Sequence, residues 1–170
     1  VNAGVPDDFS GIPVLNNLMA TFFGFKGDRE TDDIDNLWTV FEAALQFAEG
    51  DTPDSRQSFI AAYNKVLNQK CIRWNITMGL YWIRPYKFIN LDSRNREFLC
   101  NPENLSADIA AEVVVMKAVP TAEKYLDFGD KCKNALQKGI FEYKTFPELS
   151  YTAWITSKGE EESDKDDSGK

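Results

Sequence analysis

Apolar residues recur at three- and four-residue intervals along most of the chain, which is the spacing of one face of an α-helix. The clearest example begins after Asp32 and Asp33, either of which can cap a helix, and ends at Gly50. The predicted inward face of this helix consists of Ile34, Leu37, Trp38, Phe41, Leu45 and Ala48. The pattern therefore predicts that Trp38 is buried.

Prolines and small polar residues delimit the other predicted helices. These helices cover residues 13–25, 53–68, 75–84, 92–99, 106–119, 121–138 and 147–155. In the first of them, Val14, Leu18, Phe22 and Phe25 share one face. Trp82, in the third, is expected in a buried central cluster. Residues 71–76 fit either a strand or a helix, and residues 85–91 are expected to be extended or irregular after Pro85.

These elements predict a mainly α fold, a single compact domain of seven or eight helices spanning residues 11–157. Residues 1–10 form an irregular lead-in. Residues 158–170 are predicted to be a disordered acidic linker, because the run GEEESDKDDSGK contains six acidic, two basic and no apolar residues. The chain begins with Val rather than Met, which favours a fragment of a longer protein.

Composition argues against most kinds of catalytic site. Histidine is absent, which removes Ser-His-Asp, Cys-His and His-metal chemistry, and neither GxxxxGK[ST] nor GxGxxG occurs. Cys71, Cys100 and Cys132 form no CxxC pair, so we expect reduced core thiols rather than disulfides or a zinc site. No apolar run is long enough to span a membrane, and no signal peptide is recognisable. We therefore expect a cytoplasmic, non-enzymatic segment without cofactor or metal.

The basic aromatic stretch, residues 70–100, contrasts with the rest of the chain. It contains six basic and two acidic residues, a net charge of +4 in a chain whose total is -8. Arg and aromatic side chains grip planar, charged ligands, although a buried aromatic cluster rimmed by Arg stems would have the same composition. The candidate nucleic-acid-binding residues are Arg73, Trp74, Tyr81, Arg84, Tyr86, Lys87, Arg94 and Arg96.

Three motifs resemble the segment found upstream of the AAA+ motor in bacterial McrB-like restriction proteins: DDIDNLWTVFEAAL, WNITMGLYWIRPYKFINLDSRNREFL and FPELSYTAWI. The resemblance covers roughly residues 9–155, and GLYWIRPYKFINLDSRNREFL is its most specific part. It implies a role in phage defence within a parent protein whose motor hydrolyses GTP or ATP and whose partner nuclease subunit cuts. The Walker motifs of that motor are not in this segment.

Two functions therefore compete. The domain either recognises DNA, modified or unmodified, through the basic aromatic stretch, or acts as a structural adaptor that positions the motor ring or the nuclease subunit. The acidic total charge favours the adaptor, because nonspecific DNA affinity comes mainly from phosphate neutralisation. The family resemblance favours DNA recognition. A weaker resemblance of INLDSRNREFL to helical DNA glycosylases would make Asp92 catalytic, but a helix N-cap is the simpler interpretation of Asp92.

Overall fold

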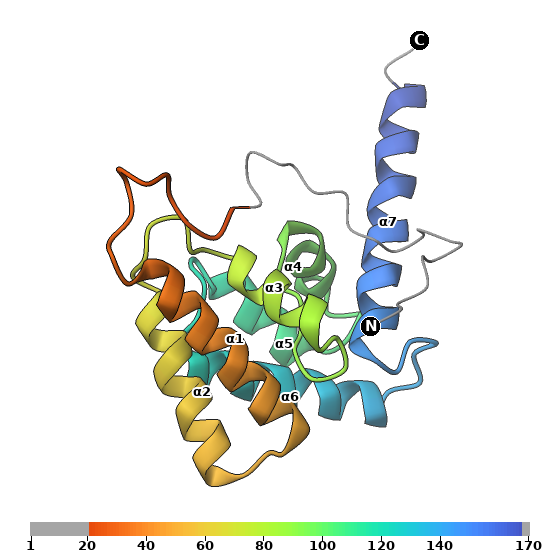
Figure 1. Ribbon diagram of the computed structural model, residues 1–170. Coiled ribbons are helices and arrows are strands. Elements are labelled where there is room, and N and C mark those ends of the chain that lie inside the picture. Colours follow the sequence, from red (N-terminus) through yellow and green to blue (C-terminus); the bar gives the residue numbers. More distant parts are fainter. Residues whose placement is uncertain (1–20, 168–170) are drawn as a thin grey trace, which may run out of the picture.

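Helices α1 (Asp33–Glu49) and α2 (Pro53–Val66) lie side by side at one edge of the molecule (Figure 1). The structure is a computed structural model that describes the backbone of residues 21–167 and the side chains of residues 21–157. Gly50 closes α1 by donating its N–H to the Gln46 carbonyl. A capping box opens α2, because Thr52 Oγ1 accepts the Ser55 N–H while Ser55 Oγ accepts the Thr52 N–H.

The other helices complete a domain that, over the described residues, contains no strand. They are α3 (Asn75–Ile83), α4 (Ser93–Cys100), α5 (Ala107–Val115), α6 (Ala122–Lys138) and α7 (Phe146–Asp167). Helix α4 packs on α5 and on the first part of α7, and α2 packs on α6. The predicted mainly α fold, with a single domain of seven or eight helices, is therefore confirmed. Among the described residues, no helix is long and apolar enough to cross a membrane.

A stack of aromatic rings forms the centre of the core. Phe59 from α2 stacks on Phe88 with ring centroids 5.3 Å apart, and Tyr63 stacks on Tyr125 of α6 at 5.7 Å. Phe47 of α1 joins the same group by stacking on Phe59. All five rings are at most 1% exposed. Because large aromatic side chains bury much apolar area, this stack holds α1, α2 and α6 to the segment between α3 and α4.

The segment between α3 and α4 crosses the interior without regular secondary structure, as predicted for residues 85–91. Its Ile89 and Leu91 side chains are almost completely buried. Two side chains satisfy its backbone: Tyr125 donates its O–H to the Ile89 carbonyl at 2.7 Å, and Thr77 Oγ1 accepts the Leu91 N–H at 3.1 Å. A buried irregular segment needs such partners for its polar backbone groups.

Both predictions of a buried tryptophan were wrong. Trp38 is 64% exposed and Trp82 is 37% exposed. Helix α1 instead buries a face rotated away from the predicted one, which consists of Val40, Ala43, Ala44 and Phe47. Small alanines allow α2 to approach α1 closely, so packing selected the face with the better fit rather than the face with the larger residues.

Several predicted boundaries also differ. Residues 21–25 are not helical, and the remainder of the helix predicted over residues 13–25, like the lead-in 1–10, lies outside the described residues. Helix α5 ends at Val115 rather than near residue 119. Pro120 disfavours helical geometry at residue 119, the residue directly before it. Helix α7 continues through Asp167, past the boundary predicted at residue 157. Glu is a good helix former, which favours this continuation.

Candidate functional site

The basic aromatic stretch separates into two groups at opposite ends of α3. Around its first residue, Asn75, lie Arg73, Trp74 and Arg96. Arg84 and Lys87 lie beyond its last residue, in the turn that follows α3. Tyr81, within α3, and Arg94, on α4, belong to neither group.

At the start of α3, the guanidinium group of Arg96 covers the ring of Trp74, with Arg96 Cζ 3.8 Å from the ring centroid. Arg96 Nε also donates to the Asp92 carbonyl at 3.2 Å. Burial lowers the pKa of Arg96, and the nearby Asp92 opposes that change. One face of Trp74 is thus occupied by Arg96, which leaves less of the ring for stacking on a base. Arg73 beside it is exposed.

At the end of α3, two basic side chains are paired with carboxylates at the end of α1. Arg84 Nη2 lies 3.3 Å from Glu49 Oε1, while Arg84 Nη1 donates to the Ile83 carbonyl at 2.8 Å. Lys87 Nζ lies 2.8 Å from Asp51 Oδ2 and 4.0 Å from the centroid of the Phe47 ring. Both cations therefore tie the turn after α3 to the α1–α2 corner.

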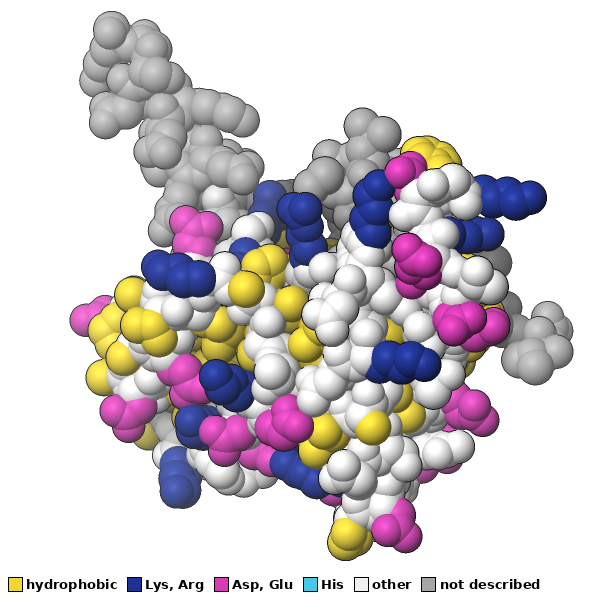
Figure 2. All heavy atoms as spheres, turned by 90° about the vertical axis from the view of Figure 1, so that its left-hand side faces the viewer, with side chains coloured by type: hydrophobic (Ala, Val, Ile, Leu, Met, Phe, Trp, Pro, Cys, Tyr) yellow, Lys and Arg dark blue, Asp and Glu magenta, His cyan; other side chains and the backbone are white. Residues whose placement is uncertain are grey.

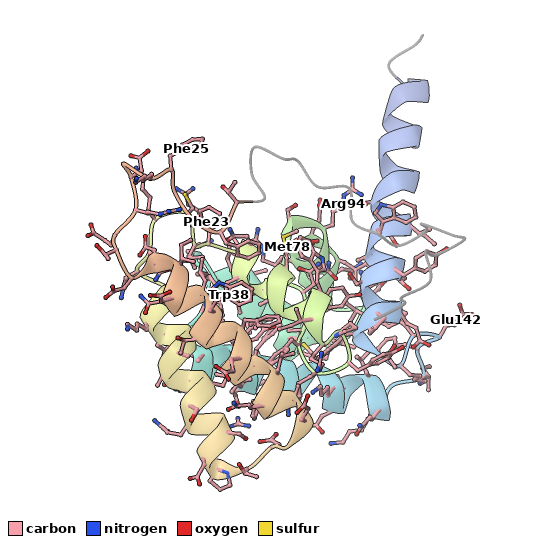
Figure 3. The ribbon with its side chains drawn as sticks, viewed as in Figure 1. Phe23, Phe25, Trp38, Met78, Arg94 and Glu142 are labelled. Carbon is pink, nitrogen blue, oxygen red and sulfur yellow. The ribbon has the colours of Figure 1, made fainter. Side chains whose placement is uncertain are left out.

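The aromatic candidates differ in accessibility. Tyr86 is 72% exposed, whereas Tyr81 is half-buried. Burial raises the pKa of Tyr81, and a hydrogen bond with Ser150 of α7 acts in the opposite direction. Arg94 extends from α4 on the side of the molecule nearer α7 (Figure 3). Of the aromatic candidates, Tyr86 presents the most open ring.

The Asp92 carboxylate caps α4 and is surrounded by hydrogen-bond donors. Asp92 Oδ1 accepts the backbone N–H of Asn95 at 2.8 Å and the Asn95 side chain at 2.9 Å. Asp92 Oδ2 accepts from the Asn90 side chain at 2.9 Å. The N-cap interpretation of Asp92 is confirmed. Asn95 also donates to Ser150 Oγ at 3.2 Å, which joins this cap to α7.

Charges of both signs alternate over the surface. Figure 2 shows Lys and Arg side chains interspersed with Asp and Glu side chains on the face where α1 and α2 lie. Ion pairs formed by residues in and next to α1 and α2 include Arg56 with Asp51, at 3.9 Å, and Lys70 with Asp28, at 2.7 Å. Over the described part of the chain, no cluster of three or more Cys, Asp and Glu side chains is placed to hold a metal ion.

An apolar groove between α1 and α3 was not predicted from the sequence. It has a volume of about 430 Å³, and the described residues that line it are Gly79 and residues with apolar side chains. The predicted inward face of α1 supplies one wall, through Leu37, Trp38 and Phe41, and Trp82 contributes to the other. The available signal was an excess of large apolar residues on α1, more than a single buried face accommodates. We call this feature the α1–α3 groove.

Comparison with known proteins identifies one family. A family model described as a domain of unknown function, DUF8425, matches residues 1–156. No curated protein and no solved structure matches the chain. The family description carries no activity.

Proposed function

The chain belongs to the DUF8425 family, and we propose that it is a non-catalytic adaptor domain that positions an AAA+ motor, or the nuclease partner of that motor, in a McrB-like restriction protein. The observation that carries this proposal is the pairing of Arg84 with Glu49 and of Lys87 with Asp51. These contacts pair two cations of the basic aromatic stretch with carboxylates of the same domain.

The electrostatics follow from these pairs. A cation that binds a phosphate gains affinity by releasing condensed counterions from DNA. Lys87 is already compensated by Asp51, so a phosphate would have to displace a carboxylate at 2.8 Å and would meet its negative charge. The chain as a whole carries a net charge of -8, which opposes nonspecific DNA binding further.

Helix α7 supports the adaptor role by its placement. Phe146, Leu149 and Ala153 anchor its first part in the core, and its later turns extend away from the body (Figure 1). A helix anchored at one end transmits the orientation of the body to whatever follows it in the chain. In the parent protein that the resemblance implies, that element is the motor.

DNA recognition is the second candidate, favoured by the group at the start of α3. Arg73 is exposed there, next to the stacked pair of Trp74 and Arg96, and Tyr86 offers an open ring at the other end of the helix. Stacking and guanidinium contacts of this kind are used to bind nucleic acids, including bases flipped out of a duplex. Such a surface would be confined to a few residues.

A titration of the chain with labelled DNA separates the two candidates. We expect no saturable change in fluorescence anisotropy with methylated or unmodified duplexes, at about 50 or about 200 mM salt. Arg73→Ala should fold normally and change nothing, because its side chain is exposed. Lys87→Ala should lower the thermal midpoint, because it removes the partly buried ion pair between Lys87 and Asp51.

The opposite pattern would support DNA recognition. Saturable binding that Arg73→Ala weakens, with a salt slope reduced by about one, would identify a phosphate contact and overturn the adaptor proposal. The same titration on the assembled parent protein tests binding that requires the motor ring.

A further inference from the structure

The α1–α3 groove leaves large apolar side chains in contact with solvent. Trp38 is 64% exposed, and Phe41 and Trp82 are each 37% exposed. The Trp38 and Phe41 rings meet edge to face, with centroids 5.7 Å apart, so they form an ordered wall. An apolar depression of this size, without a charged side chain in its lining, is a docking surface for an apolar segment.

The chain itself enters this groove at its first described residues. The Thr21 carbonyl accepts a hydrogen bond from Asn75 Nδ2 at 2.9 Å. This bond holds the backbone of Thr21 against the start of α3. Phe22 then lies over Gly79, where an added Cβ atom would be 3.0 Å from the ring. A larger residue at position 79 would require the Phe22 ring to shift by a few tenths of an ångström. Phe23 also lines the groove, on the same side of the molecule as Trp38 (Figure 3).

The segment directly before this anchor has the composition that the groove requires. Residues 13–20 read PVLNNLMA, with no charged residue. Val14 and Leu18 are spaced to lie on one helical face, and Asn16 falls on the opposite face. Eight residues span about 12 Å as a helix, similar to the roughly 10 Å that α1 rises between Ile34 and Phe41, which both line the groove.

Tethering favours this occupant over one from another molecule. A segment joined to the groove by a few residues is present at an effective concentration on the order of millimolar. The family model includes the segment, because it matches from residue 1. We propose that residues 13–20 of the same chain dock in the α1–α3 groove, with Val14 and Leu18 against the wall formed by Trp38 and Phe41. This proposal does not depend on the adaptor function.

Paired substitutions in the full chain test the docking. Leu18→Asp places a charge against the apolar wall and should release the segment, which raises iodide quenching of tryptophan fluorescence. Asn16→Asp adds the same charge on the opposite face and should leave quenching unchanged. Replacing both Trp38 and Trp82 with Phe should abolish the difference between the two variants, because these two tryptophans line the groove.

A second measurement uses the segment as a separate peptide. A chain that begins at Thr21 should show more iodide quenching of tryptophan fluorescence than the full chain. A peptide of residues 1–20 should bind saturably to this shortened chain and lower its quenching again. The Leu18→Asp peptide should bind roughly tenfold more weakly or worse, whereas the Asn16→Asp peptide should bind normally. If the shortened chain does not fold, the full-chain variants decide the question.

Two outcomes would overturn the proposal. Equal quenching in the Leu18→Asp and Asn16→Asp chains would show that the segment does not cover the groove. Self-association of the unmodified chain, lost on Trp38→Ala but unaffected by Leu18→Asp, would identify a second copy as the occupant.

Discussion

Two stacked tyrosines in the core differ in what their hydroxyl groups contact. Tyr125 donates to the Ile89 carbonyl at 2.7 Å. The hydroxyl of Tyr63 is buried and has no hydrogen-bond partner among the described residues. Burial raises the pKa of both phenols, so both are neutral at ordinary pH. A buried polar group without a partner lowers stability, whereas a bonded one contributes to it.

We therefore expect opposite results from the same chemical change at these positions. Tyr63→Phe should leave the free energy of unfolding unchanged or raise it by up to about 1 kcal/mol, because it removes an unpaired hydroxyl. Tyr125→Phe should lower it by about 1 to 3 kcal/mol, because the Ile89 carbonyl loses its partner. Urea unfolding of both variants measures the difference. A loss at Tyr63 as large as that at Tyr125 would mean that the Tyr63 hydroxyl binds a buried water.

At the scale of one helix, the start of α7 is held by a carboxylate. Glu148 Oε2 accepts the backbone N–H groups of Lys144 and Thr145, at 2.7 and 3.0 Å, and Thr145 Oγ1 accepts the Glu148 N–H at 3.4 Å. These contacts form a capping box. The bond from the Lys144 N–H is the main reason that the pKa of Glu148 lies below the usual value of 4.5.

The lowered pKa predicts a pH dependence for this cap. A carboxylate with a lowered folded-state pKa stabilises the fold above its unfolded pKa, near 4.5, and loses that effect as the pH falls through the lower folded value. Glu148→Gln should therefore lower the thermal midpoint at about pH 6 but have less effect at about pH 3. Glu142→Gln, in the exposed loop before α7, is the matched control (Figure 3). A Glu148→Gln effect that stays constant with pH would exclude a role for the charge.

Local signals were sufficient to predict the helices. The N-caps Thr52, Asp92 and Ser106 begin α2, α4 and α5 as the sequence indicates, because capping depends on neighbouring residues. Long-range packing was not predictable in the same way. Helix α1 carries apolar residues on more than one face, and only its fit to α2 decides that Val40 and Phe47 are buried while Trp38 is not.

The candidate site shows the same limit. Composition identified residues 70–100 as basic and aromatic, and the structure places these residues at both ends of α3. The carboxylates that pair with two of them come from the last residue of α1, Glu49, and from Asp51 in the loop between α1 and α2. A pairing between segments more than thirty residues apart leaves no local pattern in the sequence. The ion pairs of Arg84 and Lys87 are therefore visible only in the three-dimensional structure.

At the scale of the whole molecule, α7 has a first part packed on the core and a later part that extends away from it (Figure 1). Among the side chains that the structure describes, the last buried residue of α7 is Ala153. Residues 158–170 carry no apolar side chain, so we expect them to add nothing to the core. Their value to an adaptor would be mechanical, since a continuous helix is stiffer than a flexible linker of the same length. Stability and coupling to a motor should therefore respond differently to changes in this part of the helix.

A proline at position 160 tests this separation. Glu160→Pro removes a backbone hydrogen bond in the projecting part of α7 and kinks or breaks the helix there, at a local cost of about 3 kcal/mol. In the isolated chain, neither this substitution nor deletion of residues 159–170 should change the thermal midpoint. In the parent protein implied by the resemblance, Glu160→Pro should reduce the coupling between nucleotide hydrolysis by the motor and DNA cleavage by the nuclease partner. Glu160→Ala, which preserves the helix, should not. A fall of several degrees on deletion would show that the tail docks on the body. Unchanged coupling in the Glu160→Pro parent would mean that the orientation of the motor does not depend on α7.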